Sequence, residues 1–246
     1  MKIYPAVDIK NGRVVRLRQG RKDQESVYFE DPAEPARRWA EAGAEWVHVV
    51  DLDGAFTGHP SNWKAIEAIS ATGMKVQMGG GLRDEASVER AFLAGVARVV
   101  IGTKAVDDKG FISALVRKHG DKIAVGIDAK DGKVAVRGWV DTMDATALGL
   151  AKTVADLGVS TIIYTDISRD GMLEGPNYEA QSEMCANVSC RIIASGGVGS
   201  LEDVVLFSKL DAKHANFDGV IIGKALYEGR VDLVDALEAA RNVGRA

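Results

Sequence analysis

Short apolar runs alternate with longer amphipathic stretches along the whole chain. Runs rich in Val and Ile occupy residues 6–9, 47–51, 76–80, 99–102, 124–128, 162–166, 192–197 and 220–223. Near-continuous apolar runs of this length predict strands of a parallel sheet that is buried on both faces. The stretches 31–44, 84–96 and 144–159 predict helices, because each follows a helical pattern, begins with an Asp that can cap the first turn and closes with a glycine.

The number of these strand and helix units indicates the fold class. Eight units fit within 246 residues, which is the size of a closed (β/α)8 TIM barrel of the α/β class, whereas an open doubly wound sheet usually has fewer strands. No linker, proline-rich segment or low-complexity tract interrupts the alternation. We therefore expect a single barrel domain over residues 1–246.

Four sequence blocks recur in the same order in the two halves of the chain. The first pair is "PAVDIKNG" at 5–12 and "VGIDAKDG" at 125–132. The other pairs are "VVDLDGAFTGHPSN" with "YTDISRDGMLEGPN", "GGGLRDEASV" with "SGGVGSLEDV", and "VVIGTKAV" with "VIIGKALY". This pattern predicts two duplicated half-barrels, at about residues 1–120 and 121–246, related by a pseudo-twofold axis.

Two aspartates end equivalent strands of the predicted halves. Asp8 ends the first strand and Asp128 ends the fifth, so in a closed barrel they face each other at the mouth where active sites form. Each is followed by a Lys and a turn, with no helix directly after it to cap. A functional role is therefore favoured for this pair. Other aspartates that follow strands can serve as helix caps or buried hydrogen-bond acceptors, namely Asp51, Asp53 and Asp166.

Glycines follow the third, fourth, seventh and eighth strands at matching places. They are Gly80, Gly81 and Gly102 in the first half, and Gly196, Gly197 and Gly223 in the second. A single Gly-Gly turn needs no ligand to explain it, because glycine adopts tight turns freely. Four such turns in matched positions favour backbone donors for anions, since helix N-termini and turns of this kind bind phosphate. The sequence thus predicts two phosphate sites on opposite rims and a ligand with a phosphate at each end.

Composition narrows the choice of partners. The 31 basic and 35 acidic residues are scattered and leave a net charge of −4, so no nucleic-acid footprint is evident. No apolar run is long enough to span a bilayer and the start of the chain does not match a secretory signal, so we expect no membrane association and a cytoplasmic location. We expect Cys185 and Cys190 to be ordinary thiols, and the four histidines lack metal-ligand spacing, so no metal site is predicted and no role is assigned to His48.

The motifs together resemble one enzyme family. "PAVDIKNGRVVRL", "VHVVDLDGA", "GGGLRD", "IGTKAV", "DAKDGKVAVRGW", "TDISRDGMLEGPN", "ASGGV" and "VIIGKALYEG" occur in the order typical of the phosphoribosylformimino-5-aminoimidazole carboxamide ribonucleotide isomerases of histidine biosynthesis. The resemblance covers essentially the whole chain. It implies a cofactor-free Amadori rearrangement of an aminoaldose, ProFAR, to an aminoketose, PRFAR. ProFAR carries a phosphate at each end, in agreement with the two predicted rim sites, and we expect a monomer.

The resemblance also implies roles for individual residues. Asp8 corresponds to the general base that removes the C2 proton, and Asp128 to the general acid that protonates the ring oxygen. Asp170 resembles another family aspartate that can supply this proton instead, and the sequence does not choose between them. Thr165 resembles a hydroxyl that assists the substrate. The implied substrate and phosphate contacts are Arg16, Gly80, Gly81, Arg83, Gly102, Thr103, Trp139, Gly171, Gly196, Gly197, Gly223 and Lys224.

Two connections are unusually long for a barrel. The segments after the first and fifth strands each predict a hairpin that closes over substrate, with arginines meeting phosphate or carboxamide and Trp139 stacking on the imidazole. The alternative is a solvated basic loop and a tryptophan packed against the rim.

Three other functions fit parts of the pattern. The cyclase subunit of imidazole glycerol phosphate synthase shares the fold, but it usually has Cys and Leu ahead of the first aspartate, where this chain has "PAVDI". A bifunctional isomerase would also act on phosphoribosylanthranilate, although "GGGLR" and "VAVRGW" look more like the histidine-only form. A non-catalytic phosphosugar-binding barrel would not need the three aspartates Asp8, Asp128 and Asp170.

Overall fold

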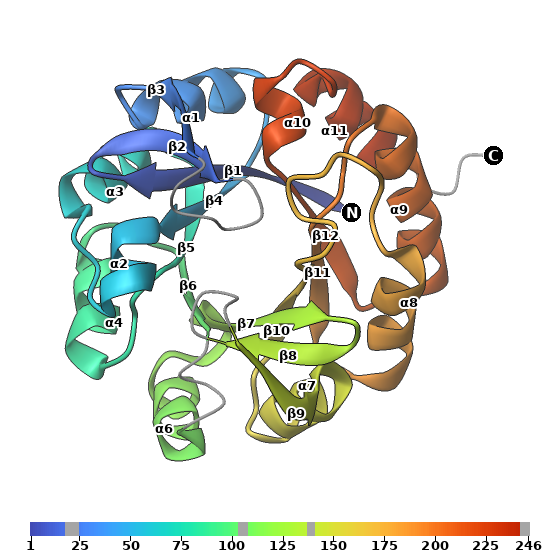
Figure 1. Ribbon diagram of the computed structural model, residues 1–246. Helices are drawn as coiled ribbons and strands as arrows, with labels where there is room; N and C mark the ends of the chain where they lie inside the picture. Colours follow the sequence, from blue (N-terminus) through green and yellow to red (C-terminus); the bar gives the residue numbers. More distant parts are fainter. Residues whose placement is uncertain (18–24, 103–107, 137–140, 242–246) are drawn as a thin grey trace.

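Eight parallel strands close into a barrel in the computed structural model, which describes residues 1–17, 25–102, 108–136 and 141–241. The barrel strands are β1 (Lys2–Lys10), β4 (Trp46–Asp51), β5 (Lys75–Gly79), β6 (Arg98–Ile101), β7 (Ile123–Lys130), β10 (Thr161–Asp166), β11 (Arg191–Ser195) and β12 (Phe217–Ile222). They pair in this order, and β12 pairs with β1 to complete the ring (Figure 1). The predicted TIM barrel and its eight strands are confirmed.

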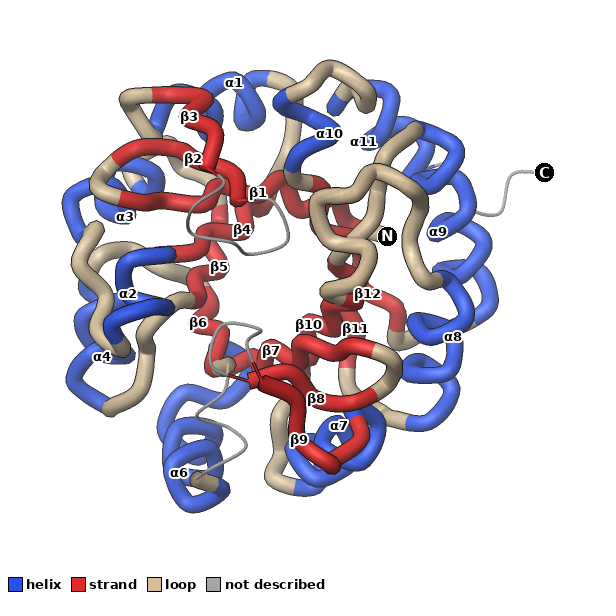
Figure 2. Tube along the Cα trace, viewed as in Figure 1, coloured by secondary structure: helices blue, strands red, loops and turns tan. Residues whose placement is uncertain are grey.

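Helices surround the ring of strands, as Figure 2 shows. They are α1 (Ala33–Glu41), α2 (Leu52–Thr57), α3 (Trp63–Ser70), α4 (Glu85–Leu93), α6 (Lys109–His119), α7 (Ala147–Asp156), α8 (Tyr178–Asn187), α9 (Leu201–Lys213), α10 (Lys224–Tyr227) and α11 (Leu233–Arg241), with a 3-10 turn η2 (Gly120–Lys122). No helix among the described residues is both long and apolar enough to cross a membrane.

Two antiparallel hairpins extend the sheet beyond the barrel. Strands β2 (Arg13–Leu17) and β3 (Glu25–Phe29) follow β1, and β8 (Lys133–Val136) and β9 (Asp141–Thr146) follow β7. They lie on opposite sides of the ring of strands (Figure 2). The two predicted hairpins are present, and their closure over substrate stays a prediction. Trp139 lies outside the described residues.

The predicted cap is confirmed at Asp84 but not at the other two aspartates. Asp31 accepts from the Ala33 N–H over 2.9 Å but lies one residue before Pro32, the N-cap of α1, which makes no side-chain cap hydrogen bond. Asp84 accepts a hydrogen bond from the backbone N–H of Ser87 at the start of α4, over 2.7 Å. The prediction that Asp144 opens the helix at 144–159 is wrong: Asp144 lies on β9, and the Thr146 side chain caps α7 instead. The segment 141–146 pairs with β8, and this pairing delays the helix until the chain leaves the hairpin.

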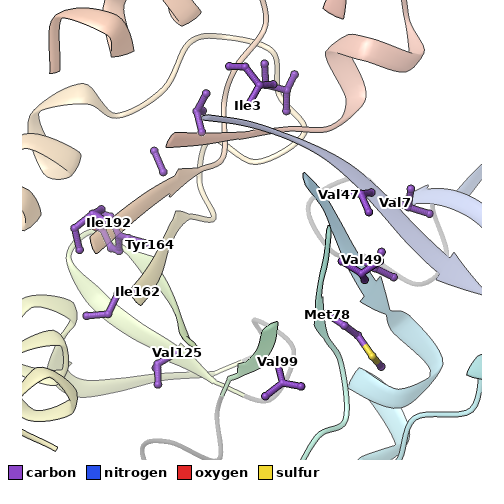
Figure 3. Packing of buried hydrophobic residues seen from close by; sticks show 14 of the residues in the cluster. Ile3, Val7, Val47, Val49, Met78, Val99, Val125, Ile162, Tyr164 and Ile192 are labelled. Atoms are coloured by element: carbon purple, nitrogen blue, oxygen red, sulfur yellow. The ribbon is translucent and has the colours of Figure 1, made fainter. Parts of the chain in front are cut away.

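The hydrophobic core has two parts that follow the alternation of side chains along the strands. The larger part lies between the barrel and the helices; Figure 3 shows Val47, Val49 and Met78 on the helix-facing side of β4 and β5. The smaller part fills the barrel interior and consists of Tyr4, Ala6, Val100, Ala124, Ile163, Ile193 and Ile221, with Trp46 packed against it. Side chains therefore fill the barrel interior below the mouth.

The two halves repeat a contact as well as the order of elements. Asn62 donates from Nδ2 to Asp51 over 2.7 Å, and Asn177 donates from Nδ2 to Asp166 over 2.6 Å. Asp51 also accepts from the Gly54 N–H and so caps α2. Asp51 and Asp166 are thus the buried acceptors that the sequence analysis allowed for. The matched pairs support the half-barrel duplication, which stays a prediction.

Candidate active site

A cavity of about 310 Å³ opens at the carboxyl ends of the barrel strands. Fourteen of the sixteen residues that the sequence nominated line it: Asp8, Arg16, Gly80, Gly81, Arg83, Gly102, Asp128, Thr165, Asp170, Gly171, Gly196, Gly197, Gly223 and Lys224. Thr103 and Trp139 lie outside the described residues. Residues from both halves of the chain therefore converge on one site, while their individual roles stay predictions.

Asp8 is paired with a cation supplied by the first hairpin. Arg16 on β2 donates from NH1 to Asp8 Oδ2 over 2.7 Å, and from NH2 to the Ala6 carbonyl over 2.5 Å. The guanidinium lies 5.1 Å from the ring centre of Tyr227, whose hydroxyl also donates to the Ala6 carbonyl. Burial raises the pKa of Asp8, and the charge of Arg16 opposes this rise. Asp8 is therefore a carboxylate held in place beside a fixed positive charge.

Asp128 lies on the opposite side of the barrel from Asp8. Strands β1 and β7 are separated by three strands in either direction around the ring. Asp128 is in register with Thr165 on the neighbouring strand β10, and the Thr165 side chain is buried. The threonine hydroxyl and the second carboxylate thus lie together on one side of the cavity, facing the Asp8–Arg16 pair.

Asp170 comes from the loop after β10 and lies close enough to Asp8 and Asp128 for their charges to act on it. Burial raises the pKa of Asp170 to about 6, and the negative charges of Asp8 and Asp128 add to this rise. The charge of Arg16 acts in the opposite direction. Asp170 consequently holds its proton to a higher pH than an ordinary aspartate does.

Close backbone packing accounts for the glycine pairs on both rims. A Cβ at Gly80 would lie 2.2 Å from the Asp51 carbonyl oxygen, and one at Gly196 would lie 2.6 Å from the Asp166 carbonyl oxygen. Both glycines have positive φ, at 105° and 93°. Gly102 differs, because a Cβ there would meet no described residue within 4 Å. The glycine pairs are therefore required by the fold, and any anion binding by their N–H groups is an additional property.

Three cations among the described residues line the cavity. Arg16 lies beside Asp8, and Arg83 follows the first glycine pair. Lys224 reaches the Gly171 carbonyl with Nζ over 3.4 Å and approaches Glu228 at 3.5 Å. Positive charge is thus present near both glycine rims, as an anionic ligand requires.

Sequence reasoning missed several residues of the cavity wall. His48 lines it from β4, and the Nδ1 of His48 lies 3.1 Å from Nε2 of Gln77. Leu52 and Phe56 line it from α2. His48 shares its face of β4 with Val50, which also lines the cavity, but the sequence carried no signal that this face is the inner one.

Comparisons with known proteins show the family of this chain. The family model described as "Histidine biosynthesis protein" matches residues 2–232. An Opitutus terrae protein, 1-(5-phosphoribosyl)-5-((5-phosphoribosylamino)methylideneamino) imidazole-4-carboxamide isomerase, is 60% identical over 240 residues, covering 98% of this chain and 99% of its own length. The chain belongs to this isomerase family. Isomerases of the same name from Syntrophomonas wolfei and Rhodopseudomonas palustris are 49% and 46% identical, covering 98% and 100% of the chain and 99% and 100% of their own lengths.

Family membership confirms the resemblance found in the sequence. The protein is an enzyme, an isomerase of histidine biosynthesis, and its fold is the one that the resemblance implied.

Proposed function

We propose that this isomerase converts ProFAR to PRFAR by acid–base catalysis, without a cofactor. The observation that carries the proposal is the convergence of three carboxylates, Asp8, Asp128 and Asp170, on one cavity. The glycine turns of both halves of the chain also line this cavity. The relatives are named as isomerases of a compound with two phosphoribosyl groups. A ligand with a phosphate at each end suits a cavity that has cations and backbone turns on both sides.

In the proposed reaction, Asp170 acts as the general acid and Asp8 as the general base. Asp170 protonates the ring oxygen, so the C1–O bond breaks and a protonated imine forms. Asp8 then removes the C2 proton to give the enolamine. When the enolamine becomes the ketone, the C2 hydroxyl gives its proton to Asp170 and Asp8 delivers its proton to C1, so both aspartates regain their starting states. The proton first given by Asp170 stays on the former ring oxygen, and the product is an isomer of the substrate. An acid and a base with separated pKa values are required, and the raised pKa of Asp170 supports its role as the acid.

Asp128 and Thr165 are proposed to orient the substrate from the opposite wall. The two are in register on neighbouring strands, so they can contact adjacent atoms of one ligand. One phosphate is assigned to Gly81, Gly102 and Thr103, and the other to Gly197 and Gly223. The protein is proposed to act as a monomer.

A coupled assay of the purified protein with ProFAR and with phosphoribosylanthranilate tests this function. We expect turnover of ProFAR and little or none of phosphoribosylanthranilate. Equal turnover of both would identify a bifunctional isomerase. Absence of turnover with both substrates, or release of a cyclised imidazole product from PRFAR and ammonia, would contradict the proposal.

A further inference from the structure

Three polar side chains form a row across neighbouring strands just below the cavity. His48 on β4 pairs in register with Gln77 on β5, and Gln77 pairs with Arg98 on β6. Gln77 is fully buried and Arg98 is 5% exposed. Side chains of this kind are rarely buried unless they are hydrogen-bonded, so the row calls for an account of its partners.

The chemistry of Arg98 determines the direction of every hydrogen bond in the row. A guanidinium only donates, so the atom of Gln77 that lies 3.3 Å from Arg98 NH1 is the amide oxygen, Oε1. The amide nitrogen of Gln77 therefore faces His48, 3.1 Å from Nδ1. An amide nitrogen also only donates, so Nδ1 must accept. A neutral His48 ring then carries its proton on Nε2.

Arg98, at one end of the row, makes further contacts. The Arg98 guanidinium lies 4.4 Å from the ring centre of Trp46, and Asp218 lies close enough for its charge to interact with Arg98.

Burial, together with the positive charges of Arg16 and Arg98, lowers the pKa of His48 to about 3. The ring is therefore neutral in the physiological range.

We infer that Gln77 and Arg98 are positioning residues that fix His48 as the Nε2–H tautomer, so that it offers a neutral hydrogen-bond donor to an oxygen atom of the bound phosphosugar. Among the described residues, the only hydrogen bond to the His48 ring comes from Gln77, and it engages Nδ1. His48 itself lines the cavity. A neutral donor suits an oxygen that gains negative charge, such as the C2 oxygen when the enolamine loses its hydroxyl proton to become the ketone, because it stabilises the charge without giving up its proton. This inference rests on the proposed function for the identity of the ligand, but not for the tautomer.

The tautomer is measured without any substrate, by NMR of the full-length protein labelled with ¹⁵N-histidine. The four histidines are distinguished by comparison with a His48→Gln variant. We expect His48 in the wild type to have a protonated Nε2 and an unprotonated Nδ1. A protonated Nδ1 in the wild type would overturn the inference, whether or not the enzyme turns over ProFAR. Failure to turn over ProFAR with the expected tautomer would count against the proposed function alone.

A matched pair of substitutions at Gln77 tests the functional consequence. In Gln77→Glu the carboxylate can accept from both Arg98 and His48, so we expect Nδ1 to become protonated and kcat to fall at least tenfold, with KM changed less than about threefold. In Gln77→Met neither bond is made, so the tautomer is no longer fixed and only the preference of a free imidazole ring for Nε2–H remains. We expect kcat of the Met variant to fall less than that of Gln77→Glu. Similar losses in both variants, or an unchanged kcat when NMR shows the changed protonation in Gln77→Glu, would overturn the positioning role.

Two substitutions at His48 distinguish its role as a hydrogen-bond donor from its role in packing. A glutamine side chain can place an N–H near the position of Nε2, whereas leucine cannot donate. We expect His48→Gln to retain about tenfold more kcat than His48→Leu, at similar KM. Equal activity of the two variants would show that no donor is used at this position.

Discussion

Arg16 donates a hydrogen bond from NH1 to Oδ2 of Asp8 over 2.7 Å, and the side chains of the two residues are only 14% and 17% exposed. An ion pair in this position is screened less by water than a surface pair is. The Arg16 charge keeps Asp8 available as an anion, while burial keeps it a stronger base than an exposed aspartate. The first hairpin thus supplies an electrostatic partner to the proposed base.

Asp8→Asn should remove nearly all turnover. The amide preserves the shape of the side chain but cannot accept the C2 proton, and a positioned base contributes about 10²- to 10⁴-fold. We expect kcat to fall at least about 100-fold, with binding of a bisphosphorylated substrate analogue changed little, as measured by calorimetry. Retention of more than about a tenth of the wild-type kcat would exclude Asp8 as the general base.

Asp170 should determine the alkaline limb of the pH profile. Its pKa is raised to about 6, and an acid must be protonated to act, so we expect kcat/KM to fall as the pH rises through about 6. Asp170→Asn should lower kcat and abolish this limb, whereas Asp128→Asn should lower activity but keep it. If Asp128→Asn removes the limb and Asp170→Asn does not, the acid is Asp128.

The same Asp170→Asn variant should be more stable than the wild type at neutral pH. The folded-state pKa of about 6 lies above the ordinary value of 3.8, so the folded state binds this proton more tightly. The stability due to that proton is fully present below pH 3.8 and is lost as the pH rises through about 6. Asparagine avoids this loss, which amounts to at most about 3 kcal/mol. Urea unfolding should show a gain at pH 8 and little gain at pH 4; an equal gain at both would exclude titration as the cause.

Substitutions at two glycines of one rim, Gly80 and Gly102, should distinguish an effect on folding from an effect on ligand binding. A Cβ at Gly80 would lie 2.2 Å from the Asp51 carbonyl oxygen, so Gly80→Ala should lower the free energy of unfolding by more than about 2 kcal/mol. A Cβ at Gly102 would lie more than 4 Å from every described residue outside its own chain neighbours, so Gly102→Ala should leave the Tm nearly unchanged.

Any effect of Gly102→Ala on the enzyme should then come from the ligand. We expect an increase in KM for ProFAR, because the added methyl group hinders the approach of a phosphate to the backbone. A bisphosphorylated analogue should also bind the wild type more tightly than the corresponding monophosphate. Equal affinities would contradict the prediction of two phosphate sites.

The equivalent asparagines should contribute similarly to stability in the two halves. Asn62 and Asn177 each donate to a buried aspartate, Asp51 and Asp166 respectively. Removing a donor from a buried carboxylate costs about 1 to 3 kcal/mol, so Asn62→Ala and Asn177→Ala should each lower the free energy of unfolding by this amount. Denaturant unfolding measures both, and Asn187→Ala on the exposed end of α8 is the control, expected to change little.

The sequence by itself determined the barrel and the place of its mouth. Parallel strands buried on both faces require near-continuous apolar runs, and those runs marked all eight strands. Asp8 and Asp128 could be placed at the mouth because strand ends are visible in sequence and barrel topology brings them to one rim. The start of α7 was misplaced because the strand pairing of 141–146 depends on the hairpin partner, which local patterns do not reveal.

Only the tertiary structure decided which polar groups meet. In a strand that is apolar on both sides, the hydrophobic pattern does not tell which side faces the barrel interior. His48 therefore looked like an ordinary strand residue, although it faces the cavity and meets Gln77, 29 residues away. The pKa of Asp170 likewise depends on burial beside Asp8, which is distant in the chain. Charge, burial and hydrogen-bond direction arise from neighbours that folding brings together, and these decide the chemistry that the residues can perform.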